Sequence, residues 1–137
     1  MIEPDHKPLP TQKDRFSLKG RIASFGYAFS GLAQVMKTEH NAWIHLCAAI
    51  LVVTAGAMLK ISTDDWTWII IAIGWVWTAE LFNTALERLC DAVSPDFNPL
   101  IGAAKDIAAA GVLVTAFGAA IIGVLRLGPH FIALISP

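Results

Sequence analysis

Residues 66–91 read WTWIIIAIGWVWTAELFNTALERLCD. The first half of this stretch carries no charged side chain, and the apolar pattern continues at helical spacing through Glu80 and Glu87. A bilayer has a hydrocarbon core about 30 Å thick, and a helix rises about 1.5 Å per residue, so about 20 apolar residues cross it. The stretch therefore predicts a transmembrane helix over about 65–90 that is polar at one end only.

Two more uncharged segments of similar length flank this one, at 42–59 and 107–125. The later segment is rich in Ala and Gly, and small residues allow helices to pack closely in lipid. The sequence therefore predicts three transmembrane helices, at about 40–60, 65–90 and 104–126.

The composition of the 137-residue chain agrees with a membrane protein. It is 55% hydrophobic and 15% charged, whereas an average soluble domain is about 25% charged. A net charge of −1 and so few charged residues speak against a disordered chain and against nucleic acid as a partner. Two cysteines, Cys47 and Cys90, fit neither a disulfide framework nor a metal quartet. We therefore expect an all-α integral-membrane protein.

The region before the first span divides into two parts. Residues 1–14 contain three prolines and mixed charge, which is typical of a flexible tail, and residues 15–137 form the membrane domain. From about 16 to 37 the apolar side chains recur in steps of three and four, at Ile22, Phe25, Phe29, Leu32 and Met36. This pattern predicts an amphipathic helix lying in the membrane surface. The alternative is a short helix that packs on its own protein.

The basic residues predict the orientation. Of the 10 Lys and Arg residues, only Lys60 and Arg126 fall on the side opposite to the N-terminus. Because basic loops stay in the cytoplasm, the N-terminus and the 89–105 loop are expected there.

Polar side chains recur on one face of the 65–90 helix. They are Glu80, Asn83, Glu87 and Asp91, spaced three, four and four. This spacing keeps them on one stripe, and it places Glu80 about 10 Å deeper than Glu87. An acid inside a span usually marks a functional site. For Glu87 and Asp91 the plainer alternative is solvation, or pairing with Arg88 and Lys105.

These residue types suit phosphoryl transfer at a membrane edge. Glu39 starts the first span at the same end as Glu87, and two carboxylates can hold Mg²⁺ that also binds nucleotide phosphates. Glu80, away from water, is a reasonable general base, and Lys105 supplies positive charge for phosphate. We therefore expect a phosphate donor on the water side and an acceptor hydroxyl presented from the lipid side.

Two other classes of function compete with a kinase. A ring of Glu80 residues from several copies could line a cation channel or transporter, although such a pore gains nothing from Lys105. A purely structural membrane protein would not need the polar stripe.

Three segments carry a family resemblance. They are FGYAFSGLAQVMKTEHNAWIH at 25–45, AELFNTALERLCD at 79–91 and AKDIAAAGVLV at 104–114. Together they strongly resemble the prokaryotic diacylglycerol kinase and undecaprenol kinase family, over roughly residues 21–126. The E-x-x-N-[ST]-A-[IL]-E core, seen from Glu80 to Glu87, is its most specific motif. In keeping with this, no Walker G-x-x-x-x-G-K-[ST] motif occurs in the chain.

The resemblance implies a small lipid kinase of the bacterial inner membrane, working as a homotrimer with sites shared between subunits. It implies Mg²⁺ and ATP, with a lipid alcohol as acceptor. By position, Glu80 matches the catalytic base, and Glu39 and Glu87 match the magnesium carboxylates. The residues that match the nucleotide site are Tyr27, Glu39, Asn83, Glu87, Asp91, Lys105 and Asp106.

The choice of lipid depends on one position. His45 stands where some diacylglycerol kinases carry an acid, in the style of undecaprenol kinases, so the resemblance implies that His45, like Glu80, belongs to the lipid substrate site. This favours undecaprenol, with diacylglycerol as the alternative. A histidine on an apolar helix is equally well explained by packing.

Overall fold

The computed structural model describes residues 18–94, 96 and 98–136, so the tail expected at 1–14 lies outside the described residues. Over the described part, the chain forms four α-helices: α1 (Leu18–Thr38), α2 (His40–Leu59), α3 (Thr63–Val93) and α4 (Pro99–Ile135). The chain divides into two compact units, one ending at Gln34 and the other beginning at Val35. The expected all-α class is confirmed.

The first unit contains most of α1. The helix expected at 16–37 is confirmed at Leu18–Thr38. The apolar side chains of Ile22, Phe25 and Phe29 are exposed, which is compatible with a helix that covers its apolar face with something other than its own unit.

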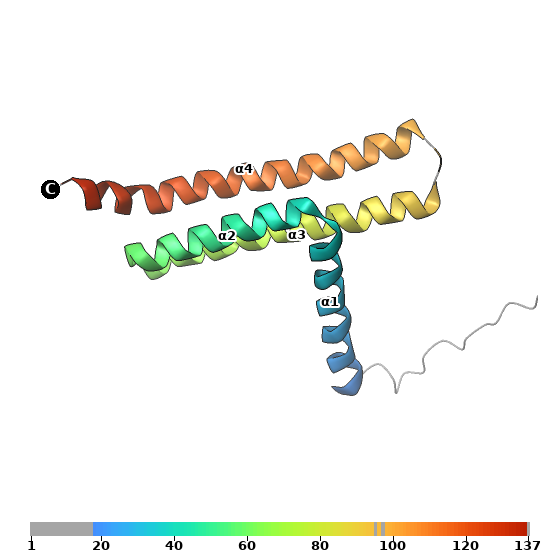
Figure 1. The fold of residues 1–137 in the computed structure, drawn as a ribbon, viewed down its shortest axis with the longest axis horizontal. Helices are drawn as coiled ribbons and strands as arrows, with labels where there is room; N and C mark the ends of the chain where they lie inside the picture. Colours follow the sequence, from blue (N-terminus) through green and yellow to red (C-terminus); the bar gives the residue numbers. More distant parts are fainter. Residues whose placement is uncertain (1–17, 95, 97, 137) are drawn as a thin grey trace, which may run out of the picture. The chain divides into compact units, whose positions relative to one another are not determined.

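In the second unit, α2, α3 and α4 lie side by side, with α3 antiparallel to the other two (Figure 1). The most extensive packing is between α3 and α4. All three are long and apolar enough to cross a membrane, as expected. With 31 residues in α3 and 37 in α4, these helices are about 46 and 55 Å long. Both exceed the roughly 30 Å hydrocarbon core, so their polar ends can reach water.

The α2–α3 turn explains why α3 starts earlier than expected. Ser62 caps the helix by accepting a hydrogen bond from the Asp65 backbone N–H at 3.2 Å, and Asp65 reciprocates by accepting from Ser62. This capping box fixes the first turn. Lys60 closes α2 in the left-handed conformation, with φ 51°, and the Ile61 N–H donates to the Gly56 carbonyl at 3.2 Å.

The third span is longer at both ends than the expected 104–126. Asn98 caps its start by accepting from the Leu100 N–H at 2.9 Å, and Pro99 follows, where a missing N–H costs nothing. At the other end the helix continues through Pro129 to Ile135. Because the helix extends this far, His130 in its last turns can contact α3.

Ion pairs join α3 and α4 at the end opposite to the α3–α4 connection. Arg126 Nη1 lies 2.9 Å from Asp64 Oδ2 and 3.5 Å from Asp65 Oδ1, and His130 Nε2 lies 3.1 Å from Asp65 Oδ2. The Arg126 guanidinium also stacks over Trp68, 5.2 Å from the ring centroid. These contacts hold the two helices in register above a small core of Ile61, Ile69 and Leu127.

Candidate active site

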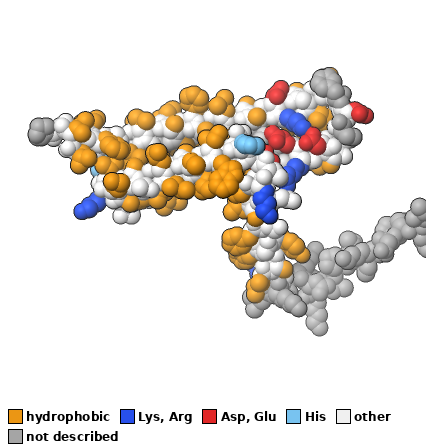
Figure 2. All heavy atoms as spheres, in the orientation of Figure 1, with side chains coloured by type: hydrophobic (Ala, Val, Ile, Leu, Met, Phe, Trp, Pro, Cys, Tyr) orange, Lys and Arg blue, Asp and Glu red, His pale blue; other side chains and the backbone are white. Residues whose placement is uncertain are grey.

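Charged side chains gather at the end of the helix bundle where α3 connects to α4. Figure 2 shows acidic and basic side chains together over this end, while hydrophobic side chains cover most of the rest of α2, α3 and α4. The polar stripe expected from the sequence therefore lies at one end of the unit, and a mostly apolar middle separates it from the ion pairs of Arg126 at the other end.

Glu80 is the deepest acid of this group. Its side chain is 2% exposed, and its Oε2 atom has no hydrogen-bond partner among the described residues. His45 of α2 faces it, with Nε2 3.9 Å from Oε2. Glu39 and Glu87 lie close enough to act on Glu80 electrostatically. A buried carboxylate with a bare oxygen is costly unless something binds there.

Asn83 and Thr84 carry two more buried oxygen atoms that lack hydrogen-bond partners among the described residues. Asn83 Nδ2 donates to Glu87 Oε1 at 3.0 Å, whereas Asn83 Oδ1 and Thr84 Oγ1 are buried without a partner among the described residues. Thr84 was not among the expected site residues, although it follows Glu80 by four positions and so shares its face. Glu80 and Asn83 line the pocket described below whereas Thr84 does not, so the two unpartnered oxygens of Glu80 and Asn83 point to a ligand that supplies hydrogen bonds.

Glu39 occupies the single non-helical position between α1 and α2. Its backbone is extended, at φ −104° and ψ 117°, and it stands at the N-cap of α2, where the helix dipole favours negative charge. The Thr38 hydroxyl donates to Glu39 Oε1 at 2.7 Å, and Arg88 of α3 donates to Thr38 Oγ1 at 2.8 Å. The carboxylate is therefore tied to α3 through Thr38.

Lys105 of α4 donates a hydrogen bond to Asp91 of α3. The pairing that the sequence left open for Asp91 is thus present, with Lys105 as the partner. Lys105 also lies near enough to Glu87 to interact with it electrostatically. Asp106, the next residue, is exposed.

A pocket of about 300 Å³ brings part of the predicted set together. Four of the polar side chains that line it are His45, Glu80, Asn83 and Glu87, and Asn41 is a fifth that the sequence did not single out. Its apolar walls come from α2 and α4: Ile44, Ala109, Val112, Leu113 and Ala116. The other predicted residues do not line it, although Glu39 and Lys105 are adjacent. Tyr27 belongs to the unit that ends at Gln34 and is exposed there.

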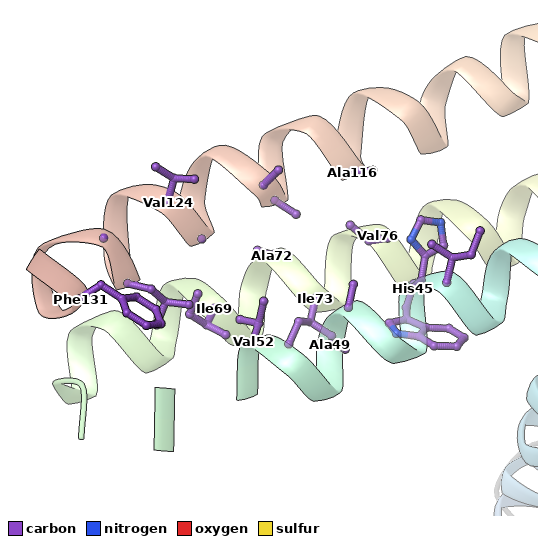
Figure 3. A pocket seen from close by; sticks show the side chains of 18 residues that line it. His45, Ala49, Val52, Ile69, Ala72, Ile73, Val76, Ala116, Val124 and Phe131 are labelled. Atoms are coloured by element: carbon purple, nitrogen blue, oxygen red, sulfur yellow. The ribbon is translucent and has the colours of Figure 1, made fainter. Parts of the chain in front are cut away.

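A second, larger cavity of about 640 Å³ continues from the first. Figure 3 shows it running along the helices, with Val52, Ile69 and Phe131 towards its far end and His45 at the near end. Except for His45 and the Trp77 indole, its lining is aliphatic, glycine or Phe131. Ile44, His45 and Ala116 line both cavities. An apolar groove thus adjoins the pocket that Glu80 lines, and the two share these three residues.

The acids present suit a cation that brings some of its own ligands. Among the described residues, no group of three or more His, Cys, Asp or Glu could hold a metal ion. Glu39 and Glu87 nevertheless offer carboxylate oxygens near Glu80, and Asn83 Oδ1 is free to accept. Mg²⁺ commonly takes one or two carboxylates together with waters and substrate phosphates, so the donor set fits magnesium that arrives with a nucleotide.

Comparison with known proteins identifies the family of the chain. Residues 26–127 match the family model of prokaryotic diacylglycerol kinase. The chain is 35% identical to the undecaprenol kinase of Bacillus subtilis, over 85% of this chain and 95% of that protein. It is 31% identical to a diacylglycerol kinase of Synechocystis, over 98% of this chain and 79% of that protein, and 27% identical to that of Escherichia coli K12, over 80% and 90%.

The family match covers every residue that lines the pocket, all of α2 and α3, and α4 as far as Leu127. The chain therefore belongs to the prokaryotic diacylglycerol kinase family and is a multi-pass membrane lipid kinase.

Proposed function

We propose that this kinase transfers the γ-phosphate of ATP to the hydroxyl of undecaprenol in preference to diacylglycerol. The observation that carries the proposal is the apolar groove that adjoins the pocket lined by Glu80. A polyprenol has one polar group, its terminal hydroxyl, and hydrocarbon everywhere else. Its hydroxyl would reach Glu80 while its chain lies along the groove.

Diacylglycerol fits this surface less well. Its two ester groups lie within a few bonds of the hydroxyl, so they would sit where the groove is lined by Ile44, Val76 and Ala116. These side chains offer no donor to an ester carbonyl. Leaving a buried acceptor without a partner costs roughly 1–3 kcal/mol. The likeness to a protein named undecaprenol kinase supports the same preference, and diacylglycerol remains the competing substrate.

The proposed division of roles follows the depth of each acid. Glu80, which lines the pocket beside the groove, takes the proton from the acceptor hydroxyl. Glu39 and Glu87, nearer the helix ends, hold Mg²⁺ on ATP, and the Asn83 hydrogen bond fixes the orientation of Glu87. Magnesium, when bound, would neutralise charge on the phosphoryl group in transfer.

The proposed nucleotide site has further members. Lys105, held by Asp91, supplies positive charge to the phosphates, and Asp106 and Tyr27 complete the set. Tyr27 is included on resemblance alone.

The polar end is proposed to face the cytoplasm, in keeping with the positive-inside tendency and with the place where ATP is found. The enzyme is proposed to be a homotrimer of the bacterial inner membrane with sites shared between subunits. Much of the surface of α2 and α4 is apolar and exposed in a single copy, so neighbouring copies or lipid must cover it. Family membership gives no support to the cation-channel alternative.

The test is phosphate transfer from labelled ATP by the purified protein in mixed micelles. Undecaprenol and diacylglycerol are offered at equal mole fraction, with magnesium and with a chelator. A higher kcat/KM for undecaprenol, lost on chelation, supports the proposal. A higher value for diacylglycerol contradicts the preference and leaves the lipid kinase assignment intact.

A further inference from the structure

A hydrogen-bonded bridge links the junction between α1 and α2 to α3. Arg88 Nη2 donates to Thr38 Oγ1 at 2.8 Å, and the Thr38 hydroxyl donates to Glu39 Oε1 at 2.7 Å. Thr38 directly precedes Glu39 in the sequence. Arg88 directly follows Glu87. The bridge therefore connects the two backbone segments that carry the proposed magnesium carboxylates.

The chemistry of the three groups sets the direction of the bridge. A guanidinium only donates hydrogen bonds, an ionised carboxylate only accepts them, and a hydroxyl does both. Arg88 uses a lone pair of the Thr38 oxygen and so leaves the hydroxyl hydrogen for Glu39. A hydroxyl that accepts from a cation is polarised and becomes a stronger donor. Arg88 thus strengthens the bond by which Thr38 holds the carboxylate.

The backbone of Glu39 is held by separate contacts. Its N–H donates to the Val35 carbonyl at 2.9 Å, and the Trp43 indole N–H donates to the Met36 carbonyl at 2.9 Å. Both bonds cross the junction between the two helices. The freedom that is left to Glu39 is therefore the rotation of its side chain. That side chain makes no capping bond to α2, and the bond from Thr38 restricts it.

Magnesium requires accurate placement of its ligands. It demands near-ideal octahedral geometry, with oxygens at about 2.0–2.1 Å. Two carboxylates from different helices can meet this demand only if each is oriented and the helices are held together. Asn83 orients Glu87, and Thr38 orients Glu39. The bond from Arg88 to Thr38 supplies the remaining constraint, because it joins the two helices beside these carboxylates.

From this geometry we propose that Arg88 and Thr38 are positioning residues for magnesium-ATP, which fix the Glu39 carboxylate relative to Glu87. The inference rests on the proposed magnesium role of these two acids, and it does not depend on which lipid is preferred. Thr38 acts through its bond to Glu39, and Arg88 acts through Thr38. Partners that orient metal ligands in this way commonly contribute about 10–100-fold to metal affinity.

The test measures magnesium affinity without turnover. Magnesium is titrated by calorimetry into the detergent-purified protein with a non-hydrolysable ATP analogue and no lipid alcohol. Thr38→Val removes the hydroxyl and keeps the shape, whereas Thr38→Ser keeps the hydroxyl. Arg88→Met removes the donor and keeps most of the length. Thr54→Val and Arg126→Met are the matched controls, since both residues lie away from the bridge. Melting midpoints and KM for the lipid are measured beside them.

Thr38→Val and Arg88→Met should each raise the Kd for magnesium about tenfold or more, with KM for the lipid unchanged. Thr38→Ser should retain most of the affinity, and both controls should bind magnesium as the wild type does. The Thr38→Val, Arg88→Met double variant should be no weaker than the weaker single variant, because residues that act through one contact are not additive.

Three results overturn the proposal. The first is an unchanged Kd for magnesium in Thr38→Val and Arg88→Met. The second is an equal loss in Thr38→Val and Thr38→Ser, which indicates a packing role. The third is a fully additive loss in the double variant, which indicates independent effects. If Arg88→Met melts early, the two Thr38 variants decide, because neither of them changes a charge or alters α3.

Glu39→Gln separates this inference from the proposed function. If Glu39→Gln weakens magnesium binding while Arg88→Met does not, the bridge has no positioning role and the magnesium role of Glu39 stands. If Glu39→Gln binds magnesium as the wild type does, the magnesium role of Glu39 is wrong, and the inference fails with it. When Glu39 is already Gln, adding Arg88→Met should cause no further loss of magnesium affinity, and a further tenfold loss overturns the inference.

Discussion

Asn83 Nδ2 donates a hydrogen bond to Glu87 Oε1 at 3.0 Å, one helical turn further along α3. The bond fixes the rotamer of a carboxylate that is only partly buried. It also leaves Asn83 Oδ1 buried and free to accept. The two residues thus act as one oxygen-bearing unit beside Glu80.

Replacing Asn83 with Ala should weaken the binding of magnesium-ATP. Glu87 loses the donor that orients it, and a hydrogen bond to a charged group is worth about 1.5–3 kcal/mol, so KM for ATP should rise about tenfold or more. Steady-state kinetics at fixed lipid measure this. Thr54→Val is the control, because the exposed Thr54 hydroxyl donates only to the Ile50 carbonyl of its own helix. An unchanged KM for ATP in Asn83→Ala would contradict the orienting role.

Glu80→Gln should remove turnover and retain nucleotide binding. General base catalysis contributes about 10²–10⁴-fold, and the amide is nearly isosteric, so the pocket should keep its shape. Glu39→Gln and Glu87→Gln should instead weaken magnesium-ATP binding as well as turnover. Nucleotide binding measured by calorimetry, beside labelled-phosphate transfer, separates these effects. Equal loss of binding in all three variants would refute the division of roles.

Gly56→Ala should destabilise the α2–α3 turn. A Cβ atom at Gly56 would lie 3.0 Å from Ile61 Cδ1 and 3.1 Å from Trp66 Cη2, and overpacking of this kind costs about 1–3 kcal/mol. Gly74→Ala is the matched control, since its Cβ would meet nothing within 4 Å and alanine favours a helix. Thermal unfolding in detergent should show a lower midpoint for Gly56→Ala alone. A midpoint equal to that of Gly74→Ala would mean that the turn relaxes.

Arg126→Ala should lower stability without changing the chemistry. The side chain pairs with Asp64 and Asp65 and stacks on Trp68, at the end of the bundle opposite to Glu87. Partly exposed ion pairs contribute roughly 1 kcal/mol or less each. We expect a lower melting midpoint, and kcat/KM within about twofold of wild type once the folded fraction is taken into account. Arg126→Lys should lose less stability. A large fall in kcat/KM with an unchanged midpoint would contradict this reading.

The three spans could be predicted from gaps between charges, because only long uncharged segments cross lipid. Their ends could not. The start of α3 depends on the reciprocal bonds of Ser62 and Asp65. The continuation of α4 past Pro129 accompanies the contacts of Arg126 and His130 with α3. Such contacts depend on how the helices pack against one another, and the spacing of apolar residues along the chain does not predict that packing.

The same distinction applies to the site. Glu80, Asn83 and Glu87 share one helix, so their spacing was sufficient to predict that they lie together. That His45 faces Glu80 depends on how α2 packs against α3, and the sequence did not predict it, although the resemblance had assigned both residues to the lipid substrate. Thr84 could have been found from its spacing to Glu80, but a threonine on an apolar helix carries little signal of its own.

The groove between α2 and α4 has a consequence for how the enzyme meets its substrate. Its lining includes exposed side chains such as Val124 and Phe131, so it is open towards the surrounding acyl chains. A lipid alcohol entering there never leaves the bilayer and arrives by lateral diffusion. The quantity that governs the rate is then the mole fraction of alcohol in the membrane. Diluting it with inert phospholipid slows turnover, and diluting the whole suspension with buffer does not.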